Sequence, residues 1–81
     1  QNYPNPFNPA TSIQFNLVQD GHVKLAVYNT LGKEIEVLVD KNMPAGSHKV
    51  EWQATDISSG VYFYRIVAGN FRDTKKMILM Q

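Results

Sequence analysis

The chain has 81 residues, 43% of them hydrophobic, with a formal net charge of +1 and no cysteine. This composition excludes a disordered tail, a disulfide framework and a thiolate metal site. The small net charge provides no basic surface that would attract nucleic acid or an anionic membrane. No apolar run approaches the roughly 20 residues that a membrane-spanning helix needs. Because the chain begins with Gln1 rather than methionine, we expect it to be a piece of a longer protein.

A segment rich in proline and asparagine precedes the first periodic stretch. Each of its three prolines fixes its own φ at about −65° and pushes the residue before it toward extended geometry. We therefore expect an extended collar over residues 1–11 that displays Tyr3 and Phe7. These aromatic rings can dock on the flank of the domain itself or on a partner, and the sequence leaves both alternatives open.

Residues 12–81 alternate between apolar and polar side chains with a period of two, which predicts β-strands. The first two runs place apolar side chains on one face at Ile13, Phe15 and Leu17, and then at Val23, Leu25 and Val27. Since only the turn signal Gln19–Gly21 separates these runs, we predict that they pair as a hairpin.

A third strand is predicted after the turn at residues 29–32, in which Gly32 suits a position that needs a positive φ. Its apolar positions are Ile35, Val37 and Val39. Glu34 and Glu36 alternate with these positions, so we expect the two carboxylates to share one solvated face.

The second half of the chain predicts three more strands. Trp52, in the run 48–53, is the largest core candidate and is expected to pack across the sheets. Gly60 opens the run 61–68, which is apolar on both faces and is therefore expected to be central, with the collar or a partner over Val61, Phe63 and Val67. Gly69 and Asn70 then predict a two-residue hairpin into the last run, 71–81.

These elements predict an all-β fold, an antiparallel immunoglobulin-like β-sandwich of six to seven strands in a single domain, 1–81. A small barrel is the alternative. Tyr62 sits where such a sandwich places a tyrosine corner, so its hydroxyl is expected to bond nearby backbone. The residues with expected structural roles are Gly32, Trp52, Gly60, Tyr62 and Tyr64.

The sequence predicts neither an enzyme nor a cofactor site. His22 and His48 lack a nearby Asp or Cys at the spacing of a metal site or a nucleophile relay, and we expect them to be surface or half-buried side chains. The isolated glycines form no phosphate loop. A calcium site made of loop oxygens around Asp56 or Asn8 is an alternative that the sequence leaves open.

Two further interpretations concern exposed side chains. Aromatic rings such as Tyr3, Phe7 or Tyr64 could stack on sugars, although core packing is the ordinary role of such residues. The final run, 75–81, is basic and then apolar. It is either an edge strand that a receptor reads by strand addition or an ordinary terminal strand whose lysines guard the edge against aggregation.

The ordered set of motifs resembles the type A C-terminal sorting domain of type IX secretion substrates, and also the immunoglobulin-like domain associated with flagellar hook-capping proteins. The strongest element is the start of the domain, formed by Asn2, Tyr3, Pro4, Asn5, Pro6, Phe7, Asn8 and Pro9. Further matching elements are Val27–Asn29 with Leu31 and Gly32, Ala45–His48, Trp52, Ser59–Arg65 and Lys75–Met77.

This resemblance implies a non-catalytic secretion address behind an N-terminal cargo. Its implied partners are components of the type IX translocon and a surface sortase, and its implied destination is the cell surface or the medium, reached through the periplasm of a Gram-negative bacterium. The segment that the resemblance assigns to translocon recognition consists of Lys75, Lys76, Met77, Ile78, Leu79 and Met80. An accessory carbohydrate- or cell-surface-binding module is the alternative function, and a structural spacer is a third.

Overall fold

The computed structural model describes residues 2–3, 10–54 and 57–80, with only the backbone of residues 2 and 3. These residues form seven strands: β1 (Asn2–Tyr3), β2 (Ala10–Leu17), β3 (Gly21–Tyr28), β4 (Glu34–Met43), β5 (Gly46–Gln53), β6 (Gly60–Ala68) and β7 (Phe71–Leu79). Strand β2 begins two residues before Ser12, where the alternation starts. A search of the described residues finds no helix that could cross a membrane.

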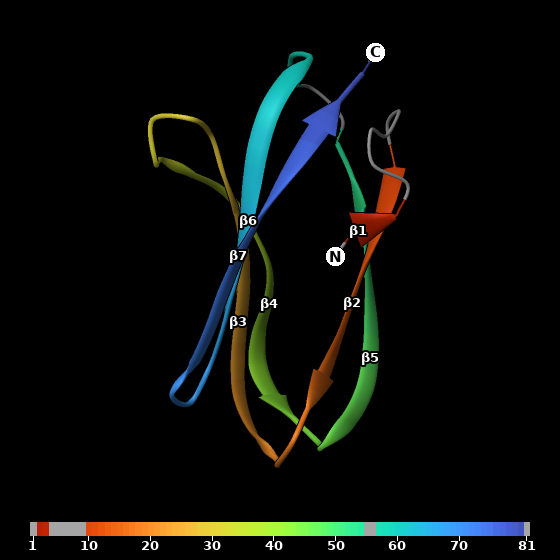
Figure 1. Ribbon diagram of the computed structural model, residues 1–81, viewed down its shortest axis with the longest axis vertical. Coiled ribbons are helices and arrows are strands. Elements are labelled where there is room, and N and C mark those ends of the chain that lie inside the picture. The colour runs from red at the N-terminus through yellow and green to blue at the C-terminus, as the bar shows by residue number, and fades with distance from the viewer. Residues whose placement is uncertain (1, 4–9, 55–56, 81) are drawn as a thin grey trace.

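The strands form two antiparallel sheets that face each other (Figure 1), which confirms the predicted β-sandwich. One sheet has the order β1-β2-β5 and the other has the order β4-β3-β6-β7. In the constant-type immunoglobulin arrangement, the fourth strand belongs to the sheet of the first, second and fifth strands. Here β4 pairs with β3 instead, so the fourth strand has moved to the other sheet.

The predicted hairpin between the first two long strands is wrong. Strand β2 pairs with β1 and β5, whereas β3 pairs with β4 and β6, so the turn at residues 18–20 carries the chain from one sheet to the other. Both strands keep their predicted apolar faces. Those faces oppose each other across the core instead of lying side by side, because each sheet must bury one face against the other.

The core lies between the two sheets and is built from the inward-facing positions of the strands. Trp52 is 2% exposed, as expected for the largest core candidate, and its ring meets that of Tyr62 edge-on with centroids 6.4 Å apart. The predicted inward faces of β2 and β3 are confirmed: Phe15 is half-buried and packs against the core, and the other five residues are buried, namely Ile13, Leu17, Val23, Leu25 and Val27.

Strand β4 departs from simple alternation. Its register with β3 shifts twice, between Leu25 and Ala26 and again between Val27 and Tyr28, so β4 contains two extra residues over this stretch. A shift of one residue turns the following side chains to the opposite face of the sheet. The prediction that Val37 faces the core is therefore wrong: its side chain is 41% exposed, and Leu38 packs against the core instead.

Strand β6 is central, as predicted, with β3 on one side and β7 on the other. Its buried residues are Tyr62, Tyr64 and Ile66, so Val61, Phe63 and Val67 lie on the outward face and stay partly exposed. The collar residues 4–9 that were expected over this face lie outside the described residues. The two-residue hairpin at Gly69 and Asn70 is present, with Ala68 opposite Phe71.

Candidate functional site

The segment expected to be recognised, residues 75–80, consists of the end of strand β7 and Met80 beyond it, and β7 pairs only with β6 among the described strands. Met77 and Leu79 are fully buried in the core, because their positions face the other sheet. Lys75 and Lys76 are exposed, and Met80, just past the strand, is 53% exposed. The candidate segment thus divides into two residues that hold the sandwich together and others that a partner can reach.

The outward face of β7 continues onto β6. In the register of the two strands, Lys76 lies opposite Phe63 and Ile78 lies opposite Val61. Cross-strand neighbours of this kind have adjacent side chains on the same face. The outward surface beside the edge is therefore both basic and apolar.

In the pairing of β6 with β7, Tyr64 lies opposite Lys75, on the inward side of the sheet. Tyr64 is 3% exposed, and its hydroxyl has no hydrogen-bond partner among the described residues. Burial, together with the negative charge of Asp73, raises the pKa of Tyr64 from 10.0 to about 12. Because the ring is buried, Tyr64 does not offer the sugar-stacking surface that the sequence left open.

The hydroxyl of Tyr62 donates a hydrogen bond of 2.6 Å to the carbonyl oxygen of Ser58. This is the contact expected of a tyrosine corner, and it ties the start of β6 to the connection that precedes it. Gly60, between the two residues, has a φ of 150°, a conformation that favours glycine. The role of this corner is to fix the path of the chain into the central strand.

The turn between β3 and β4 is organised by Asn29. Its side-chain oxygen accepts hydrogen bonds from the backbone N–H groups of Leu31 and Lys33, at 2.9 and 3.0 Å. Gly32 adopts the expected positive φ, 82°. The turn therefore forms locally, which explains why β4 pairs with β3.

Glu34 and Glu36 do not share a face, contrary to the prediction, because the register shift at Ile35 separates them. On the outer side, a carboxylate oxygen of Glu34 lies 3.1 Å from the ammonium of Lys24. Glu36 turns toward the other sheet, where it accepts a hydrogen bond from the indole N–H of Trp52 at 3.0 Å. Both carboxylates thus have structural partners.

The two histidines lie where the sequence predicts, at exposed and half-buried positions. The ring of His22 bonds a carboxylate oxygen of Asp40 at 2.5 Å, across the β3–β4 pair. His48 bonds the carbonyl oxygen of Pro44 at 2.7 Å, and its ring lies beside that of Phe15. Each ring therefore has a hydrogen-bond partner on a neighbouring strand or turn.

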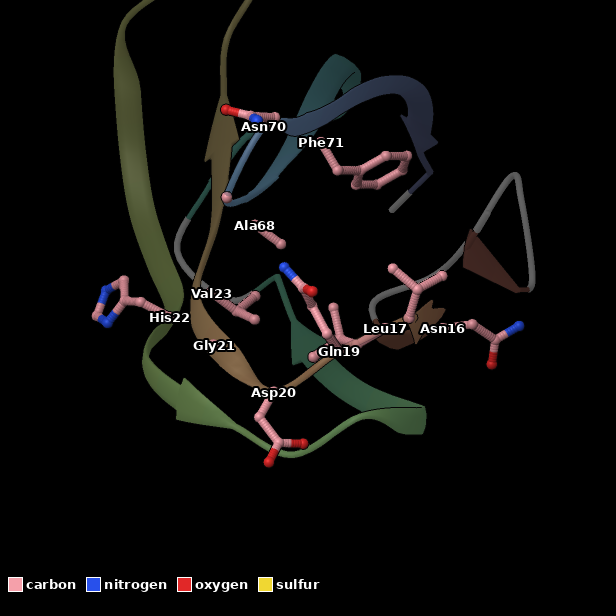
Figure 2. A pocket seen from close by; sticks show the side chains of 12 residues that line it. Asn16, Leu17, Gln19, Asp20, Gly21, His22, Val23, Ala68, Asn70 and Phe71 are labelled. Atoms are coloured by element: carbon pink, nitrogen blue, oxygen red, sulfur yellow. The ribbon is translucent and has the colours of Figure 1, made fainter.

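A cavity of about 490 Å³ opens at the end of the sandwich, between the β2–β3 turn and the β6–β7 hairpin. Figure 2 shows Phe71, from the start of β7, and Leu17, from the end of β2, directed toward the same hollow. Phe71 is 52% exposed. Sequence reasoning missed this cavity, because it depends on which strands meet across the sandwich.

Several candidate residues lie outside the described part of the chain. Asn8 and Asp56, the proposed centres of a calcium site, are among them, and so is Phe7. Of the motif at the start of the domain, only the backbone of Asn2 and Tyr3 is described, and it pairs with β2 as strand β1. The structure thus brings the beginning of this motif into the sandwich itself.

A model of the secretion system C-terminal sorting domain matches residues 1–80. The chain belongs to this family. Comparison with curated proteins and with solved structures finds no match. The family gives the sorting domain its function: it is a C-terminal signal for type IX secretion, attached to an N-terminal cargo, and it marks that cargo for export across the outer membrane to the cell surface or the medium.

A sorting domain is generally non-catalytic, and its functional surface is one that a secretion machine recognises. Among the features described above, the edge strand β7 and the cavity beside Phe71 are accessible from outside, whereas Tyr62, Gly32 and Glu36 maintain the fold. The sequence does not predict the inter-sheet hydrogen bond of Glu36, because this bond forms only when a bulge in the strand turns Glu36 toward the other sheet.

Proposed function

We propose that the type IX translocon recognises the folded sorting domain at β7, through the exposed side chains of Lys75, Lys76 and Met80. The observation that carries this proposal is that β7 lies at the edge of its sheet among the described strands and leaves these side chains exposed. A receptor can reach the exposed side chains of such a strand, and their alternate positions provide specificity.

The chemistry of this surface indicates the kind of receptor. Lys76 and Arg72 project outward from β7, opposite the apolar side chains Phe63 and Val67 of β6. A complementary receptor surface would combine acidic with apolar side chains, because opposite charges across an interface favour the correct partner. Docking of such a surface on the outward face of β7 and β6 brings these groups together without any change in the core.

Removal of the whole segment cannot test this proposal, because Met77 and Leu79 are core residues. A sharper test reverses the charge of Lys75 and Lys76 to glutamate in a fusion of residues 1–81 behind a periplasm-directed reporter. The matched control reverses Lys41 and Lys49, which are also exposed lysines on strands. Export is the fraction of reporter found on the cell surface and in the medium of a bacterium with a type IX system.

We expect the Lys75→Glu, Lys76→Glu variant to fold and to remain in the periplasm, and the control to be exported as efficiently as the unmodified domain. Equal export of both variants would overturn the proposal. Circular dichroism of the purified domains establishes that both variants are folded.

The proposal extends to the finer features of the family. We propose that the domain acts without catalysis of its own and that a surface sortase cuts it from the cargo at the segment preceding β2, where the family motif Asn2–Pro9 marks its start. Mass spectrometry of the exported reporter tests the second statement. A new C-terminus before residue 10 supports it, and an intact fusion in the medium contradicts it.

A further inference from the structure

The two edges of β2 are paired very unequally. On one side, β5 pairs with all eight residues from Ala10 to Leu17. On the other side, β1 pairs only with Ser12 and Ile13, and no other strand of the described chain continues that ladder toward Leu17. A further strand can add to an open edge of this length, because its backbone N–H and C=O groups otherwise form hydrogen bonds with water alone.

A groove runs beside this open edge. A cavity of about 200 Å³ lies between β2, β6 and β7, and the cavity of about 490 Å³ at the end of the sandwich adjoins it. Asn16 and Phe71 line both cavities, so the two are adjacent. We call the two cavities together the β2 groove.

The walls of the β2 groove combine apolar and polar surface. Phe71 is half-exposed, and Val18, next to the end of β2, is 98% exposed. The buried hydroxyl of Tyr64 lacks a hydrogen-bond partner among the described residues, and Tyr64 lines the smaller cavity. Apolar side chains left exposed beside an open strand edge suit an added strand, which supplies both side chains and backbone polar groups.

The direction of β1 identifies the occupant. Since β1 is antiparallel to β2, with Asn2 opposite Ile13 and Tyr3 opposite Ser12, the chain that precedes β1 runs toward Leu17. Figure 1 shows β1 beside β2, part-way along its length. A sorting domain follows an N-terminal cargo, so a linker enters at this point.

We propose that the linker from the cargo extends β1 along the open edge of β2 and fills the β2 groove. Continued in the same register, Phe15 lies opposite the residue that immediately precedes residue 1, and Leu17 lies opposite the third residue before it. Cross-strand partners share a face, so these two linker side chains point into the groove, as do Phe15 and Leu17. Folding of the sorting domain thereby orders the end of its cargo.

A disulfide test uses the absence of cysteine from residues 1–81. In the full-length precursor, a cysteine at the position immediately before residue 1 is combined either with Phe15→Cys or with the control Gln14→Cys. Directly opposed side chains are close enough for a disulfide, whereas those of adjacent residues on one strand point to opposite faces. We expect an intramolecular cross-link with Phe15→Cys and none with Gln14→Cys.

Three results would overturn the proposal: equal cross-linking of both variants, no cross-link in either, or a cross-link between two chains, which would identify a second copy as the occupant. Export is not measured, so the result is independent of whether the translocon recognises β7.

Because Phe15→Cys removes a partly buried ring, a second measurement uses the unmodified side chains of the domain. Hydrogen exchange of the full-length precursor is compared with that of a variant whose three linker residues before residue 1 are prolines, which cannot donate to a strand ladder. We expect the amides of Gln14–Leu17 that point away from β5 to exchange about tenfold faster or more in the proline variant. The amides of Gly46–Gln53 serve as the control and should not change. Unchanged exchange over Gln14–Leu17 would contradict the proposal.

Discussion

The indole N–H of Trp52 donates a hydrogen bond of 3.0 Å to a carboxylate oxygen of Glu36, and this bond joins the two sheets. Trp52 lies on β5 and Glu36 on β4, two edge strands that follow each other in the chain but belong to different sheets. The bond exists because the register shift at Ile35 turns Glu36 toward the opposite sheet. Strand β4 is thereby connected to the three-stranded sheet although its ladder lies in the other.

The first prediction concerns this inter-sheet bond. The substitution Glu36→Ala removes the acceptor of a partly buried indole N–H, and we expect the free energy of unfolding to fall by about 1–3 kcal/mol. The control Glu34→Ala removes a carboxylate of the same strand that faces the outer side, and its effect should be smaller. Urea denaturation of residues 1–81 measures both. Equal effects would show that the bond to Trp52 does not connect the sheets energetically.

The second prediction compares the two buried tyrosines of β6. Tyr62→Phe removes the hydrogen bond to the carbonyl oxygen of Ser58 and should lower the free energy of unfolding by about 1 kcal/mol. Tyr64→Phe removes a buried hydroxyl that has no partner among the described residues, so it should leave the stability unchanged or raise it. Thermal and urea denaturation test the contrast, and the opposite order would refute it.

Several features of this fold follow from local sequence patterns, whereas the assignment of strands to sheets does not. The inward faces of β2 and β3, the burial of Trp52 and the hydrogen bond of Tyr62 depend on local periodicity and local turns, so they could be predicted. Sheet membership could not be predicted, because the same alternation and the same Gln19–Gly21 turn fit a hairpin and a crossover between sheets equally well.

The bulges in β4 were also beyond prediction. Ile35, Val37, Leu38 and Val39 are all apolar, so nothing in the pattern shows which of them face the core. The exposure of Val37 and the inward turn of Glu36 follow only once the register with β3 is known. For the same reason, the open edge of β2 could not be predicted, since it depends on pairing between segments far apart in the chain.

The third prediction follows from the raised pKa of Tyr64. This pKa is about 12 in the folded state and 10.0 without the protein environment, so between these values the unfolded state loses a proton that the folded state keeps. The free energy of unfolding is therefore unaffected by this group below pH 10, and it falls as the pH rises from 10 toward 12. Unfolding free energies measured across this range should fall more steeply for the unmodified domain than for Tyr64→Phe. Parallel curves would contradict the assignment.

The fourth prediction separates folding from recognition within the terminal segment. Met77→Ala should lower the free energy of unfolding by about 2–5 kcal/mol, because Met77 is fully buried. Met80→Ala should change it by less than about 0.5 kcal/mol, because this side chain is half-exposed. Denaturation of both variants provides the measurement. A large loss of stability in Met80→Ala would show that Met80 belongs to the core, and it would then be unsuitable as a recognition residue.

The most direct test of the central claim is the destination of a reporter fused ahead of residues 1–81 and directed to the periplasm. The fusion is expressed in a bacterium with a working type IX system and in a matched strain whose translocon is inactivated, and the reporter is quantified in periplasm, on the cell surface and in the medium. We predict that it reaches the surface or the medium only in the first strain. Retention of a folded, soluble fusion in the periplasm of both strains would contradict the claim that this chain is a sorting signal.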